Sequence, residues 1–168
     1  MNLNEEVEIL KGVPIFAKIE PAKLKLIAFT GERMTFNAGQ ELFHQGDRGD
    51  AMYVILGGVA DVLIDNDSGG QITVAEMRKN NFVGDMAILC DVPRTATVQA
   101  KTRLVALRIA KEPFLRMVRE FPNMAVSIMR ELAHRLELTN QQLRTALSEL
   151  RELRGGTAHL QPDADAAE

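Results

Sequence analysis

Between residues 33 and 109 the chain consists of short apolar runs separated by glycine-bearing turns. Runs of this kind, rich in Val, Ile, Leu and Phe, are typical of β-strands. Many short strands at short intervals favour an antiparallel sandwich or roll. The sequence therefore predicts an α+β fold built on an antiparallel β-roll or jelly roll of about eight strands. The expected strands are Arg33–Phe36, Glu41–His44, Met52–Leu56, Val59–Ile64, Ile72–Met77, Thr95–Ala100 and Arg103–Ile109.

Helical periodicity appears on both sides of this region. The expected helices run from Glu5 to Leu10, from Pro21 to the residue before Gly31, from Lys111 to Val118 and from about Pro122 to Arg154. The prediction divides the chain into N-terminal helices (residues 1–31), a β-roll (32–110), C-terminal helices (111–154) and a polar tail (155–168). Gly155 and Gly156 are expected to end the last helix, and the tail composition predicts disorder.

The last expected helix carries a heptad repeat. Apolar residues recur every seven positions at Met129, Leu136, Leu143 and Leu150, and a second register holds Ala125, Leu132, Thr139, Ala146 and Leu153. Such a pattern predicts a coiled coil, here a parallel homodimer through Ala125–Leu153 in which Glu149 could pair with Arg154 of the partner. The alternative is a helix that packs only on its own domain.

Composition excludes several classes of function. The net charge of −3 gives no long-range attraction to nucleic acid, and no apolar run approaches the length of a membrane span. The single cysteine, Cys90, fits a reducing compartment, so a cytoplasmic location is expected. His44, His134 and His159 are scattered, which argues against a metal-dependent enzyme on a cupin-like barrel. One cysteine and no evident paired axial ligands equally disfavour an iron–sulfur or haem sensor.

Residues 82–98 carry the chemistry of an anion site beside a sugar acceptor. Gly84 allows close approach of backbone to ligand, and the expected helical turn Asp85–Leu89 would present free N–H groups at Met86 and Ala87. Arg94, after the rigid Pro93, offers a planar fork for phosphate oxygens. Asp85 is an acceptor that suits ribose hydroxyls rather than phosphate. A phosphate next to a ribose indicates a cyclic nucleotide.

The same stretch resembles the phosphate-binding cassette of the cyclic nucleotide-binding domain family. The matching residues are Gly84, Ala87, Leu89, Pro93, Arg94, Ala96, Thr97 and Val98. One departure concerns the family's ribose-binding Glu, which is Asp85 in this chain, one methylene shorter. The segment from Gln45 to Val59 also resembles the family's early hairpins, so the resemblance covers about residues 12–150.

The resemblance implies further ligand contacts. Thr95 would add a hydroxyl and an N–H to the phosphate, and Val62 and Val74 would pack on the base, although plain strand core is the alternative for both valines. The long helix resembles that of the catabolite activator branch of the family, where a Thr and the next residue bind the adenine amino group, one from each subunit. Thr139 and Asn140 match that pair, with a Thr bonded to its own helix as the alternative. Arg135, one turn earlier, could pair with Asp85 and tie the helix to the cassette.

The leading hypothesis is a non-enzymatic sensor of cyclic AMP, with cyclic GMP as the alternative ligand, that moves a C-terminal dimer helix. About a dozen residues follow Arg154, too few for a DNA-reading module, so no direct DNA binding is expected. Two alternatives remain open. One is a dimerisation scaffold whose pocket has lost its ligand, and the other is the regulatory fragment of a larger transcription factor, channel or kinase.

Overall fold

The computed structural model describes residues 2–156. The chain divides into two compact units, with the boundary between Ile128 and Met129. The first unit contains the sheets and most of the helices, and the second is the remainder of the last helix.

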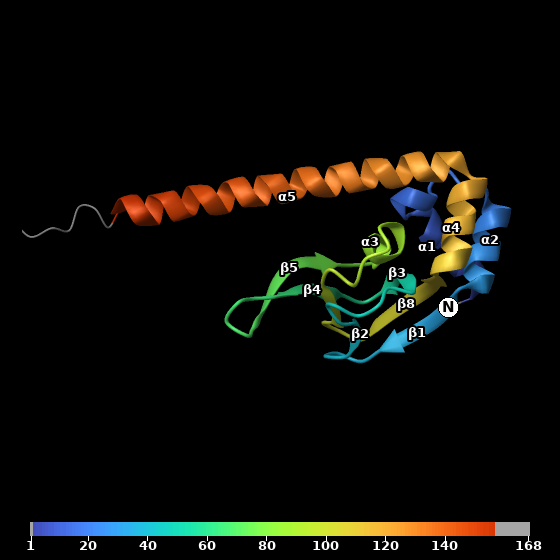
Figure 1. Ribbon diagram of the computed structural model, residues 1–168. Coiled ribbons are helices and arrows are strands. Elements are labelled where there is room, and N and C mark those ends of the chain that lie inside the picture. Colours follow the sequence, from blue (N-terminus) through green and yellow to red (C-terminus); the bar gives the residue numbers. More distant parts are fainter. Residues whose placement is uncertain (1, 157–168) are drawn as a thin grey trace, which may run out of the picture. The chain divides into compact units, whose positions relative to one another are not determined.

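The first unit opens with three helical segments (Figure 1). α1 (Leu3–Lys11) begins at a capping box, in which the Asn2 side chain accepts from the Glu5 N–H and the Glu5 carboxylate accepts from the Asn2 N–H. A short 3₁₀ helix follows at Pro14–Phe16, and the sequence did not indicate it. α2 (Pro21–Thr30) has proline in its first turn, as expected. It contacts strand β8 (Leu104–Ala110), as does the later helix α4 (Lys111–Glu120).

Eight antiparallel strands form two four-stranded sheets, in the orders β1-β8-β3-β6 and β2-β7-β4-β5. This arrangement confirms the predicted fold. The strands are β1 (Glu32–Phe36), β2 (Glu41–Phe43), β3 (Ala51–Gly57), β4 (Ala60–Asp65), β5 (Gln71–Met77), β6 (Phe82–Val83), β7 (Thr97–Ala100) and β8 (Leu104–Ala110).

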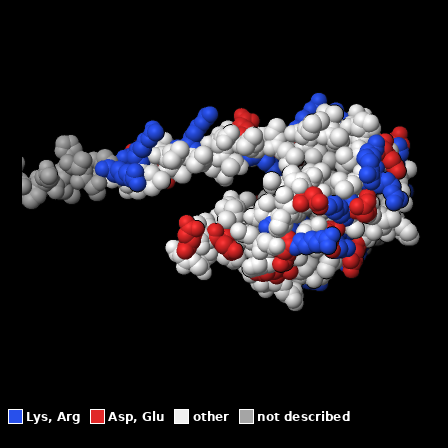
Figure 2. Space-filling model, in the orientation of Figure 1, with Lys and Arg blue, Asp and Glu red and all other residues white. Residues whose placement is uncertain are grey.

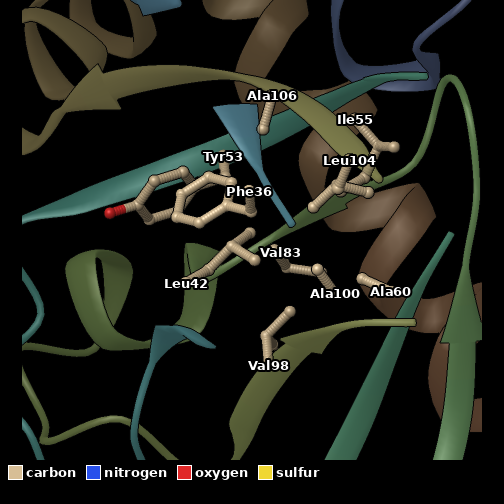
Figure 3. Packing of buried hydrophobic residues seen from close by; sticks show 10 residues of the cluster. All are labelled: Phe36, Leu42, Tyr53, Ile55, Ala60, Val83, Val98, Ala100, Leu104 and Ala106. Carbon is tan, nitrogen blue, oxygen red and sulfur yellow. The ribbon is translucent and has the colours of Figure 1, made fainter. Parts of the chain in front are cut away.

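The hydrophobic core lies between the two sheets (Figure 3). One sheet contributes Phe36, Tyr53, Ile55, Val83, Leu104 and Ala106, and the other contributes Leu42, Ala60, Val98 and Ala100. The rings of Phe36 and Tyr53 meet edge to face, with centroids 6.5 Å apart. β3 is buried along almost its whole length, whereas most residues of β5 are exposed, so the strands differ in how much of each belongs to this core.

Two details of the strand prediction were wrong. β6 was missed because a two-residue strand is too short to show an alternating pattern. The strand expected from Thr95 begins at Thr97 instead. Arg94, the residue before Thr95, explains the difference. Its N–H donates to the carbonyl of Asp47 at 2.8 Å, and its carbonyl accepts from the Gly46 N–H at 2.8 Å. A loop therefore holds this backbone, not a neighbouring strand.

The C-terminal helices are α4 (Lys111–Glu120) and α5 (Pro122–Gly156). Gly155 and Gly156 are the last two residues of α5 and the last that the structure describes, so the expected end of the helix at these glycines stays a prediction. The rest of that expected tail, residues 157–168, lies outside the described residues. On the visible face of the first unit, Lys and Arg are interspersed with Asp and Glu (Figure 2), so both signs of charge share this face.

Candidate functional site

The cassette connects the two sheets. β6 pairs with β3 in the first sheet and leads into Gly84 and α3 (Asp85–Leu89). The chain then returns through residues 90–96 to β7, a strand of the second sheet. The helical turn expected at 85–89 is confirmed. Because both ends of the cassette are fixed in sheets, its backbone is positioned by rigid elements on either side.

Gly84 has a backbone conformation that other residues rarely adopt, with φ at +82°. A Cβ at this position would lie 2.5 Å from Nη1 of Arg94 and 3.2 Å from the carbonyl oxygen of Ala51. Glycine is therefore required twice, by the backbone angle and by the guanidinium packed against it.

Arg94 is almost completely buried, with 3% of its surface exposed. Its Nη1 donates to the Gly84 carbonyl at 3.0 Å and its Nη2 donates to the Ala51 carbonyl at 2.7 Å. The carboxylate of Asp50, itself largely exposed, lies 3.7 Å from Nη2. The guanidinium also stacks on the ring of Phe43, 4.0 Å from the centroid. These contacts fix both terminal nitrogens of the side chain.

Nε, the remaining nitrogen of this guanidinium, differs from the two Nη atoms. Nε of Arg94 is buried and makes no hydrogen bond within the part of the chain that the structure describes. Burial lowers the pKa of the Arg94 guanidinium, while electrostatic interactions with Tyr53 and Asp50 act in the opposite direction. A buried cation with an unused donor is costly unless an anion completes it. This nitrogen is therefore available to donate to an anion.

The residues of α3 differ in exposure. Asp85 and Ala87 are each 3% exposed, whereas Met86 points outward at 48%. Gly49 packs directly under the helix, because a Cβ placed on it would lie only 2.3 Å from Cβ of Ala87. Thr95 is exposed next to the buried Arg94. The structure thus brings Gly84 into contact with Arg94 and Gly49 into contact with Ala87, whereas the roles of Ala87 and Thr95 in binding an anion stay predictions.

The two valines expected near the base behave differently. Val62 on β4 is partly buried and packs against the core cluster, which fits the alternative of plain strand core. Val74 on β5 is 41% exposed. It lies at an irregularity in the pairing of β4 with β5, between the pairs Val62–Ala75 and Leu63–Thr73. A role for either side chain in base contact stays a prediction.

Arg135, Thr139 and Asn140 belong to the second unit, and their relation to the cassette stays a prediction. Within α5 the Thr139 hydroxyl donates to the Arg135 carbonyl at 2.9 Å, which is the alternative considered for this threonine. Nε of Arg135 lies 3.3 Å from Oε1 of Glu131, one turn earlier. Asn140 is exposed.

Sequence reasoning missed two parts of the site. One is the ring of Phe43, which in the sequence is an ordinary apolar residue of a strand. The other is the pair of backbone carbonyls, from Gly84 and Ala51, that hold Arg94. Carbonyl directions depend on how the strands meet, so no residue pattern could have indicated them.

Residues 2–156 contain neither a candidate metal site nor a candidate membrane-spanning helix. No group of three or more His, Cys, Asp or Glu side chains in this range is arranged to hold a metal ion. No helix in the same range combines the length and apolarity needed to cross a bilayer.

Comparison with known proteins identifies relatives of several kinds. Residues 33–121 match the model of the cyclic nucleotide-binding domain. The regulatory subunit of cAMP-dependent protein kinase from Blastocladiella emersonii is 32% identical over 65% of this chain and 27% of its own length. Lysophospholipase NTE1 from Chaetomium globosum is 28% identical over 69% of this chain and 8% of its own length. The chain therefore spans about a quarter or less of these relatives.

Among solved structures, the catabolite activator protein of Thermus thermophilus has the same fold. It superposes with a TM-score of 0.71 at 26% identity, over 79% of this chain and 62% of that one. The family match covers the strands, α3 and Arg94 together. This chain belongs to the cyclic nucleotide-binding domain family.

Proposed function

We propose that the cassette binds cyclic AMP, with the cyclic phosphate on Arg94. The observation that carries this proposal is the buried, unpartnered Nε of Arg94. The two Nη atoms already have carbonyl partners, so the open edge of the guanidinium is the one that includes Nε. A charge-assisted bond from that edge to a phosphate oxygen would satisfy the buried Nε–H donor.

The other cassette residues supply the rest of the nucleotide site. The backbone N–H groups of Met86 and Ala87 and the exposed Thr95 bind further phosphate oxygens in this proposal. The carboxylate of Asp85 accepts from ribose hydroxyls, and Val62 and Val74 contact the base. Support comes from the burial of Asp85 and Ala87 on α3. This helix directly follows Gly84, whose backbone carbonyl accepts a hydrogen bond from Arg94.

The long helix provides the regulatory element. Five apolar residues of the heptad seam, Met129, Leu136, Leu143, Leu150 and Leu153, are each at least 55% exposed. Apolar side chains in this regular pattern fit a second copy of the chain as the partner, so we propose a parallel homodimer through Ala125–Leu153. Thr139 lies on this seam, and its hydroxyl oxygen retains acceptor capacity for the adenine amino group of cyclic AMP, with Asn140 from the other subunit. Arg135 would couple the helix to Asp85.

The chain itself acts as a sensor and not as a catalyst in this proposal. A relative is named as a kinase regulatory subunit and another as a lysophospholipase, and this chain matches only a small share of each. The domain therefore regulates an activity located elsewhere, in the same polypeptide or in a partner. Ligand binding at the cassette and at Thr139 would favour one position of α5 over another.

Calorimetric titration with cyclic AMP, cyclic GMP and 5′-AMP tests the proposal. Saturable binding of cyclic AMP, tighter than that of cyclic GMP, with no binding of 5′-AMP, is expected. Preference for cyclic GMP would overturn the choice of base. Absence of binding by either cyclic nucleotide would make the chain a ligand-free dimerisation scaffold, with the short side chain of Asp85 as the first cause to examine.

A further inference from the structure

Phe43 lies at a junction between the core and the cassette. Its strand, β2, pairs with β7, and the pairing shifts register between Glu41 and Phe43. The ring is partly buried against the core cluster, and it packs on Tyr53 with centroids 5.8 Å apart. Tyr53 in turn contacts Phe36. These three rings form a column, and the Arg94 guanidinium stacks on its outer member at 4.0 Å.

The outer ring of this column, that of Phe43, can stabilise the buried guanidinium of Arg94 in the ligand-free protein. Arg94 is buried, and its Nε has no hydrogen-bond partner among residues 2–156. A buried cation is destabilising unless something compensates for its lost hydration. An aromatic face attracts a cation without using any of its N–H donors. The ring can therefore stabilise the guanidinium and leave the Nε–H available.

The ring also limits where the guanidinium can go. One of its atoms, Cε1, would lie 3.3 Å from a Cβ at position 84, so Phe43 and Gly84 bound the same small space. The two carbonyls fix the guanidinium in its plane through Nη1 and Nη2, and the ring fixes it from one face. A smaller aliphatic side chain would leave that face open.

We propose that Phe43 is a positioning residue for the phosphate-binding arginine, which its ring holds in the binding orientation before any ligand arrives. This inference rests on the proposed function for its effect on affinity, but its structural part applies to the ligand-free protein. Preorganisation of this kind increases affinity because the side chain is not ordered anew on binding.

The first test needs no ligand. The ¹⁵N relaxation of Arg94 Nε is measured in the ligand-free protein, with the signal assigned by its loss in Arg94→Lys. We expect an order parameter near about 0.85 in the unaltered protein, a fall to below about 0.6 in Phe43→Leu, and recovery in Phe43→Tyr. Phe36→Leu is the matched control, because it removes a ring of the same column that contacts Tyr53 instead of the arginine. An unchanged order parameter in Phe43→Leu would overturn the proposal.

The second test is affinity. Phe43→Leu should weaken cyclic AMP binding about 5- to 30-fold, equal to about 1–2 kcal/mol, whereas Phe36→Leu should change it by no more than about twofold. Should Phe43→Leu fail to fold, Phe43→Met removes the ring with a flexible side chain that fills irregular space. Unchanged affinity in a variant whose arginine has become mobile would also overturn the proposal.

The two tests separate this inference from the proposed function. If the unaltered protein binds no cyclic nucleotide but Phe43→Leu mobilises Arg94, the nucleotide proposal fails and the positioning of Arg94 stands. If the protein binds cyclic AMP but Phe43→Leu changes neither the order parameter of Arg94 Nε nor the affinity, the nucleotide proposal stands and the positioning role of Phe43 fails.

Discussion

Gly84 and Arg94 are ten residues apart in the chain and in direct contact, with Nη1 of Arg94 donating to the Gly84 carbonyl at 3.0 Å. Gly84 follows a strand of one sheet, and Arg94 precedes a strand of the other. The contact therefore closes the cassette across the two sheets. It also requires glycine, because a Cβ at position 84 would lie 2.5 Å from the same nitrogen.

Gly84→Ala should displace the arginine. Alanine would have to adopt a φ of +82°, which is unfavourable for it, and its methyl group would collide with Nη1 of Arg94. We therefore expect a loss of about 2–4 kcal/mol in the free energy of unfolding, together with weaker cyclic AMP binding. Gly39→Ala is the matched control, because φ is +86° there and nothing lies within 4 Å of the added Cβ. The control should lose only about 1–2 kcal/mol and keep its affinity. Denaturant unfolding and calorimetry measure the two effects, and equal losses in both variants would contradict the contact.

Gly49→Ala tests the packing under α3. The added methyl would lie 2.3 Å from Cβ of Ala87, and neither atom can rotate away. We expect α3 to shift, at a cost of about 1–3 kcal/mol in stability, with a loss of nucleotide affinity. Gly57→Ala has open space around its added Cβ and should change stability by no more than about 0.5 kcal/mol. Normal affinity in Gly49→Ala would show that the position of α3 is unimportant for binding.

Much of this fold could be predicted from the sequence because its strands are short apolar runs separated by glycine-bearing turns. The glycine turns indicated most of the strands, and the run containing Gly84 and Arg94 indicated the cassette. Residue patterns within one segment gave little information about contacts between segments that are distant in the sequence. The carbonyl of Ala51 and the ring of Phe43 hold Arg94 from strands more than forty residues upstream. Such contacts depend on how the sheets come together, which the spacing of residues along the chain does not show.

In the second unit, the sequence predicted the helix but not the hydrogen bonds that its side chains make. The heptad pattern predicted a helix from about Pro122 to Arg154, and α5 covers that range. The same pattern places Thr139 on the seam, but it could not show that its hydroxyl bonds to the Arg135 carbonyl. A seam position and a bond within the helix are compatible, because the hydroxyl oxygen can still accept.

The heptad seam gives a prediction about assembly. Leu143→Lys would place a charge on the apolar seam, so we expect it to abolish the homodimer. Leu138→Lys is the control, because Leu138 is also exposed, at 45%, but lies off the seam. Sedimentation velocity distinguishes the two states. A dimer that survives Leu143→Lys would mean that the contact surface lies elsewhere, and a monomeric unaltered protein would contradict the dimer itself.

Asp85→Glu should tighten cyclic AMP binding. The longer side chain of Glu extends the carboxylate by one methylene toward the ribose hydroxyls, and one better hydrogen bond to a charged group corresponds to about 1.5–3 kcal/mol. Asp67→Glu, in the exposed turn before β5, is the control for the same chemical change and should leave the dissociation constant unaltered. Weaker binding in Asp85→Glu would mean that the buried pocket is adapted to Asp.

The most direct test of the account is a pair of cyclic AMP titrations, on the unaltered protein and on Arg94→Ala. Arg94→Ala removes the buried guanidinium with its free Nε–H, so the dissociation constant should rise about 10- to 100-fold or more, or about 1.5–3 kcal/mol. Arg103→Ala, which removes an exposed arginine before β8, should bind as the unaltered protein does. Equal affinity in Arg94→Ala and the unaltered protein would contradict the assignment of Arg94 as the phosphate ligand.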